Sequence, residues 1–77
     1  MSYNTLHRQA QYIARIAMKH PVGVCVLAGR VLVLNLTDTK QREQWERTAA
    51  TVPSLCVGVY GAGADQATIH DDLMAVK

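Results

Sequence analysis

His70 begins the densest group of chemically reactive side chains in this sequence, because Asp71 and Asp72 follow it directly. A histidine beside two carboxylates could serve acid–base catalysis or bind a metal ion. Consecutive residues of a helix point in different directions, however, so these three side chains cannot converge on one atom. His7 and His20 lie at opposite ends of an expected helix and cannot share a site on it. We therefore predict no metal site and no catalytic histidine.

Cys25 and Cys56 each lie in a valine-rich segment with the composition of a β-strand. A nucleophilic thiol needs an electropositive, partly open setting, which such strands do not supply. Two cysteines without paired histidines also make no zinc site. In a reducing compartment we expect two buried thiols, with a disulfide as the alternative. Because Ser2 and Ser54 have no neighbouring base in the sequence, an enzyme is the class of function that we expect least.

A glycine-containing segment, Gly61-Ala62-Gly63, follows an expected strand and precedes an expected helix, as a dinucleotide-binding loop does. Gln66 stands where the third glycine of that fingerprint belongs, and no further strand follows to complete a strand–helix–strand unit. The segment is therefore predicted to be an ordinary turn, and no cofactor is expected.

A basic stripe is predicted on the first helix. Its members recur at i, i+4, i+7 and i+11 and are Arg8, Tyr12, Arg15 and Lys19. This spacing places three cations and one aromatic ring on one helix face, opposite the apolar side. Such a face can contact phosphates or the acidic surface of a protein. The simpler alternative is a solvated helix face, since three cations on one helix are common.

The stretch Val22–Leu36 is predicted to form a β-hairpin around which the fold is organised. It contains two β-branched, apolar runs that join at a turn around Gly29. We expect a turn closed by a glycine bulge, which sets Val24 opposite Leu32. Neither face of this hairpin is polar, so both faces must be covered by helices or by a second copy of the chain.

Two helices are expected on either side of the hairpin in the sequence. The first covers Thr5–Lys19, and its apolar stripe consists of Leu6, Ala10, Ile13, Ala14 and Ala17. The second runs from the N-cap Asp38 to about Thr51, with Gln41 as the capping-box partner. Its apolar side is thin, so we expect Trp45 to anchor this helix on the sheet, with an exposed position in an interface as the alternative.

A third strand is expected over Leu55–Tyr60. On a regular strand, one face would carry Leu55, Val57 and Val59, and the other Cys56, Gly58 and Tyr60. A short helix should then open at Asp65 or Thr68 and place Asp71 and Asp72 in its first turn, where the helix dipole favours acids.

The resulting order, α-β-β-α-β-α, predicts a single α+β domain over residues 1–77. The helix between the last two strands should act as a crossover and make these strands parallel. We therefore expect a mixed three-stranded sheet that is built on the central hairpin and covered by helices.

The segment from Val24 to Val59 resembles a BON domain, a small α/β module of bacterial envelope and osmotic-stress proteins. The resemblance rests on Gly29-Arg30-Val31-Leu32-Val33-Leu34 after a valine-rich strand, then Asp38, a helix and Val52-Pro53-Ser54-Leu55. It implies a similar topology. A structural homo-oligomeric module with this topology is a further alternative for the function. No lipid-binding residue is transferred from that family.

Composition limits the classes of function further. With 49% apolar and 18% charged residues the chain is that of a folded protein, and its net charge of +2 is too small to predict nucleic-acid binding by itself. The N-terminus has no apolar signal core or lipidation motif, and no apolar run is long enough to cross a bilayer. We therefore expect a cytoplasmic protein without membrane contact.

The function we expect is non-enzymatic binding to a larger protein or nucleoprotein. A phage or mobile-element accessory protein that inhibits a host defence complex of the CRISPR type fits this description. Nucleic-acid binding through the basic stripe is the alternative. Because 77 residues bury a limited core and both hairpin faces are apolar, we also expect a homodimer or a tight hetero-complex.

Overall fold

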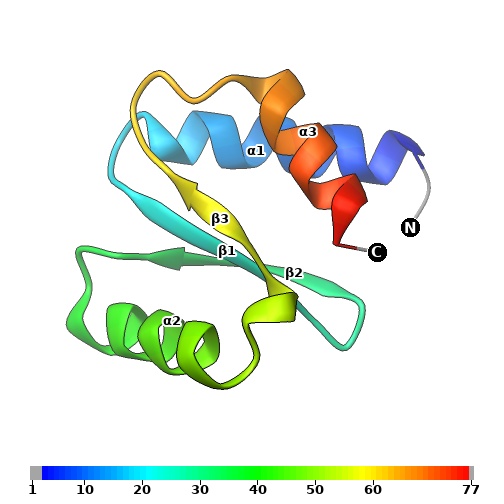
Figure 1. The fold of residues 1–77 in the computed structure, drawn as a ribbon. Helices are drawn as coiled ribbons and strands as arrows, with labels where there is room; N and C mark the ends of the chain where they lie inside the picture. The colour runs from blue at the N-terminus through cyan, green and yellow to red at the C-terminus, as the bar shows by residue number, and fades with distance from the viewer. Residues whose placement is uncertain (1–2, 77) are drawn as a thin grey trace.

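The computed structural model describes residues 3–76, and the elements in this range follow the predicted α-β-β-α-β-α order (Figure 1). They are α1 (Tyr3–Ala17), β1 (Val22–Leu27), β2 (Arg30–Asn35), α2 (Thr39–Thr51), the 3₁₀ helix η1 (Pro53–Leu55), β3 (Cys56–Tyr60) and α3 (Gln66–Ala75). The predicted α+β class is confirmed.

The sheet is antiparallel, and the prediction of a mixed sheet was wrong. Its strand order is β2-β1-β3, and β1 pairs antiparallel with both neighbours. It follows that β2 and β3 run in the same direction, as expected for two strands joined by a helix. They do not form a parallel pair, because β1 lies between them.

The hairpin turn is shorter than predicted. Ala28 has a φ of 52° and Gly29 a φ of 76°, so both lie in the left-handed region, which is typical of a two-residue type I′ turn. Val24 consequently pairs with Val33 and not with Leu32. This one-residue difference in register exchanges the side chains on the two faces of β2.

The larger core lies between the sheet and the pair of helices α1 and α3. Buried residues of this core are Leu6, Ala10, Ile13, Ala17, Val22, Val24, Tyr60, Ile69 and Leu73. The predicted apolar stripe of α1 is confirmed, with Ala14 packed at the edge of this core. Val31 and Val33 pack against it from β2, as the observed register requires.

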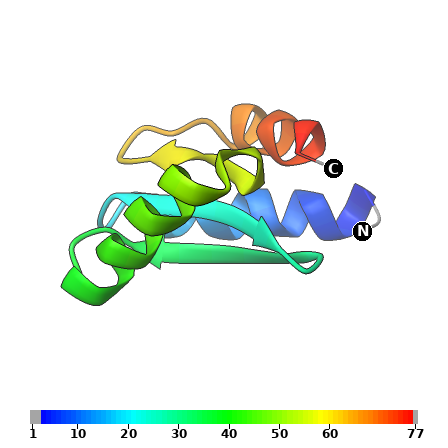
Figure 2. The ribbon, with the colours of Figure 1, turned by 60° about the horizontal axis from the view of Figure 1, so that its bottom comes forward.

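The helix α2 covers the opposite face of the sheet (Figure 2). Trp45 lies directly on Gly23, where a Cβ atom would come within 2.6 Å of the indole ring. The prediction that Trp45 anchors this helix is confirmed, although the side chain is only half-buried. Because helices of the same chain cover both faces, the sheet itself does not require a second copy of the chain.

A β-bulge interrupts the pairing of β1 with β3. Val24 lies opposite Gly58, whereas the next residue, Cys25, lies opposite Cys56. Val57 is therefore the extra residue, and it packs against the larger core together with Tyr60. The predicted strict alternation of β3 side chains was wrong for this reason.

Aspartate side chains cap both later helices. Asp38 accepts a hydrogen bond from the Gln41 N–H at 3.1 Å, as predicted for α2. The Gln41 side chain does not complete a capping box, because its Oε1 accepts from the Asn35 N–H at 2.9 Å. Asp65 caps α3 by accepting from the Thr68 N–H at 3.3 Å.

The helix α3 begins at Gln66, one turn earlier than a start at Thr68 would give. Asp71 and Asp72 therefore lie beyond its first turn, and the prediction that the helix dipole explains these acids was wrong.

Candidate functional site

The basic stripe lies on the solvent-exposed side of α1. Its four side chains, Arg8, Tyr12, Arg15 and Lys19, are all exposed, and the tyrosine shows 51% of its surface. The helix ends at Ala17, so Lys19 extends the stripe from the following turn, where its N–H donates to the Ile16 carbonyl at 2.9 Å. The stripe is opposite the buried side of the helix, as its spacing predicts.

One flank of α1 faces α3 and the loop that precedes it. His7, Gln11, Ala14 and Met18 recur on this flank with the same spacing as the stripe, one residue earlier at each position. Two pockets open along the flank, and Asp65 and Gln66 at the beginning of α3 line both of them.

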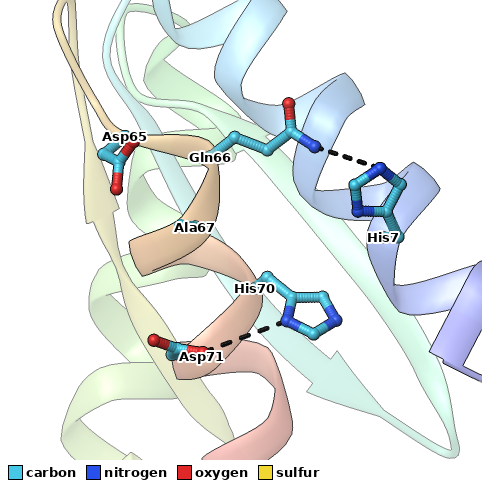
Figure 3. Close-up of a pocket in the computed structure, with 6 residues that line it drawn as sticks. All are labelled: His7, Asp65, Gln66, Ala67, His70 and Asp71. Carbon is cyan, nitrogen blue, oxygen red and sulfur yellow. Dashed lines mark hydrogen bonds and ion pairs between the residues drawn. The ribbon is translucent and has the colours of Figure 1, made fainter.

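The first pocket, here called the histidine pocket, has a volume of about 390 Å³ (Figure 3). It is lined by His7, Asp65, Gln66, Ala67, His70 and Asp71. The rings of His7 and His70 face each other from α1 and α3, with centroids 6.3 Å apart and planes at 68°. Gln66 Nε2 lies 3.5 Å from His7 Nε2, and His70 Nδ1 lies 4.0 Å from Asp71 Oδ1.

The side chains of the histidine pocket offer hydrogen-bonding and acid–base groups but no hydroxyl or thiol. None of the residues that line the histidine pocket carries a hydroxyl or a thiol that could act as a nucleophile. Asp71 exposes 82% of its side chain, so water screens its charge from His70. Within residues 3–76, no group of three or more His, Cys, Asp or Glu side chains is placed to hold a metal ion.

The second pocket, here called the Met18 pocket, has a volume of about 520 Å³ and adjoins the basic stripe at Arg15. Its lining residues are Gln11, Ala14, Arg15, Met18, Gly63, Ala64, Asp65 and Gln66. Met18 is 73% exposed, which makes it the most exposed large apolar side chain of the described residues. The segment Gly61-Ala62-Gly63, which was predicted to be an ordinary turn, contributes Gly63, with a φ of 88°, to a turn beside this pocket.

The cysteines lie away from both pockets, on the sheet. Cys25 is fully buried and Cys56 is half-buried, and both are free thiols. Burial raises the pKa of the Cys25 thiol, and the charge of a neighbouring Cys56 thiolate raises it further. The prediction of two buried thiols is therefore confirmed for Cys25 and holds only in part for Cys56.

The pairing of His7 with His70 was not predicted. His7 follows the core residue Leu6, and His70 follows the core residue Ile69, so each histidine stands beside the buried stripe of its helix. When two helices pack along such stripes, the flanking side chains meet. This pattern is present in the sequence, but it becomes informative only when the two helices are known to be neighbours.

Comparison with known proteins gave no match to a family model, to a curated protein or to a solved structure. The resemblance to BON domains therefore stays a prediction. Within residues 3–76, no helix has the length and the apolar character that crossing a bilayer demands.

Proposed function

We propose that this protein is a non-enzymatic binding protein that docks on an acidic surface of a larger protein. The observation that supports this proposal is the continuity of the basic stripe with the Met18 pocket along α1. Arg15 belongs to both, so cations and an open, mostly apolar pocket lie side by side on one exposed face.

The residue types on this face suit a protein partner. Arginine, tyrosine and methionine are enriched at protein interfaces, and Arg15, Tyr12 and Met18 supply one of each. Cations on the rim of an interface steer an acidic partner and fix its orientation, whereas an apolar pocket at its centre holds a side chain. An acidic surface with a protruding apolar side chain is thus the complementary partner.

A nucleic-acid partner has less support. Phosphate-binding surfaces are strongly positive, but Asp65 lines the pocket next to the stripe, and the net charge of the chain is only +2. Inhibition of a host nucleoprotein complex by a phage or mobile-element protein is one setting for the proposed function, and it would place the contact on a protein subunit of that complex.

The test compares two triple variants that change net charge equally. The first, Arg8→Gln/Arg15→Gln/Lys19→Gln, removes the cations of the basic stripe. The matched control, Lys40→Gln/Arg42→Gln/Arg47→Gln, removes three exposed cations from α2 on the other side of the sheet. Immobilised wild type and both variants are incubated with nuclease-treated lysate of the source organism, and the captured proteins are identified by mass spectrometry.

We expect an acidic protein that the wild type and the α2 control retain and that the stripe variant loses at least tenfold. With the purified partner, Met18→Ala should also weaken binding.

The proposal would be wrong if nuclease treatment abolished the capture and the wild type bound single-stranded oligonucleotides in a salt-sensitive way. These results would show a nucleic-acid-binding protein instead. In that case Tyr12→Ala should weaken single-stranded binding more than duplex binding. Equal capture by all three proteins would exclude the stripe, and self-association measured by light scattering would then favour the homo-oligomeric module.

A further inference from the structure

The β-bulge in β3 brings the two cysteines of the chain face to face. If β3 had no bulge, the pairing of Val24 with Gly58 would continue with Cys25 opposite Val57. Cys56 would then lie on the other face of the sheet from Cys25. The bulge removes this offset, so that Cys25 and Cys56 are direct partners on adjacent strands.

Direct partners on antiparallel strands are within the reach of a disulfide. Their Cα atoms are separated by about 4.5–5.5 Å. Disulfides in proteins span Cα separations of about 4.4–6.8 Å. Cys56 is also the first residue of β3 and follows η1 directly, so its backbone lies at a strand end and not within a continuous ladder.

The two thiols differ in their access to solvent. Cys25, in the central strand, has no exposed surface, whereas Cys56 is half-buried. An oxidant in solution therefore meets Cys56 first, and Cys25 lies opposite Cys56 on the adjacent strand. This arrangement of one accessible and one buried thiol is that of an attacking cysteine and a resolving cysteine.

We propose that Cys25 and Cys56 form an oxidation site, at which a peroxide converts the two thiols to a disulfide that joins β1 to β3. The proposal is independent of the binding function above, because neither cysteine belongs to the stripe or to a pocket.

The reaction balances in two steps. Cys56 Sγ attacks one oxygen of hydrogen peroxide, the O–O bond breaks, and a sulfenic acid and one water form. Cys25 Sγ then attacks the Cys56 sulfur, the S–O bond breaks, and the hydroxyl leaves as a second water with the thiol proton of Cys25. Two thiols are thereby oxidised by two electrons, and one peroxide is reduced to two waters.

The experiment treats the folded wild type with hydrogen peroxide and follows the mass of the intact chain. We expect a loss of about 2 Da, reversible with dithiothreitol, because two thiol hydrogens leave. Trypsin without reductant should then yield a linked pair of peptides, residues 20–30 and residues 48–77, which carry one cysteine each. The link should form at least tenfold faster in the folded protein than in urea, since the fold holds the two sulfur atoms together.

Two variants separate the roles of the thiols. Cys56→Ser leaves only the buried Cys25, and its tryptic peptide, residues 20–30, which contains no methionine, should keep its mass under the same peroxide treatment. Cys25→Ser leaves the accessible thiol without a partner, so dimedone should trap its sulfenic acid. Circular dichroism verifies that each variant is folded. If a variant does not fold, the rates of disulfide formation in the folded wild type and in urea decide the proposal. Oxidation of wild-type Cys56 to a sulfinic acid with Cys25 still reduced, or linkage that is equally fast in urea, would overturn the proposal.

Discussion

The hydroxyl of Tyr60 donates a 2.6 Å hydrogen bond to Asp72 Oδ2 and so joins the end of β3 to the middle of α3. The ring of Tyr60 is buried in the larger core, and its hydroxyl passes over Gly58, where a Cβ atom would lie only 3.1 Å from it. Asp72 is therefore a structural acid that holds the last helix on the sheet.

Replacing Tyr60 by phenylalanine should lower the free energy of unfolding by about 1–2 kcal/mol, because the change removes the donor to a charged, partly buried acceptor. Tyr12→Phe is the matched control, since this tyrosine is 51% exposed. Urea denaturation of the three proteins gives the comparison. An equal loss in both variants would mean that the bond to Asp72 does not stabilise the fold.

Stability should also fall in alkali through Tyr60. Burial, followed by the hydrogen bond to Asp72 and the charge of that carboxylate, raises the pKa of this tyrosine in the folded protein. A group whose pKa is raised by folding contributes its full stabilisation below its unfolded pKa of about 10 and loses it as the pH rises above that value. Between pH 9 and pH 11, the wild type should lose more stability than Tyr60→Phe, and denaturation curves across this range check the difference.

Gly23→Ala should destabilise the protein by about 1–3 kcal/mol, because the new Cβ would lie 2.6 Å from the indole of Trp45. Gly61→Ala provides the control, since nothing lies within 4 Å of a Cβ there and its stability should stay the same or rise slightly. In a Trp45→Ala background, the cost of Gly23→Ala should disappear. A cost that persists there would assign the effect to the strand backbone and not to the contact with the ring.

Trp45→Ala should cost about 3 kcal/mol, near the lower end for an aromatic truncation, because the ring is half-buried on Gly23. Gln44→Ala, an exposed neighbour on the same helix, should change stability by less than about 0.5 kcal/mol. Guanidinium denaturation, followed by far-ultraviolet circular dichroism, measures both variants. A loss well below 1 kcal/mol for Trp45→Ala would assign the ring to an interface.

Local patterns in the sequence predicted the elements and the exposed face of α1. The period of the apolar residues placed Leu6 and Ile13 inside and Arg8 and Tyr12 outside, because a helix fixes these directions within a few turns. Aspartate caps were predicted for the same reason, since Asp38 acts on an N–H only three residues away.

Features that depend on two distant segments were not predicted. The pairing of β3 with β1, and not with β2, depends on which strand edge is free when the chain returns, and no local pattern encodes this choice. The bulge at Val57 and the meeting of His7 with His70 likewise involve segments that lie far apart in the sequence. The one-residue error in the hairpin had a local cause, because Ala28 adopts a positive φ that alanine rarely adopts.

The position of β1 between β2 and β3 also suggests the order in which the two strand pairings form during folding. Pairing with β2 closes a two-residue turn, whereas Cys56 follows its partner Cys25 by 31 positions, so β3 must close a far longer loop. The local pairing costs less chain entropy and can precede the packing of α2, while the second pairing depends on it. Gly29→Ala, which strains a turn residue with a φ of 76°, should therefore slow folding, whereas a change such as Tyr60→Phe should chiefly accelerate unfolding.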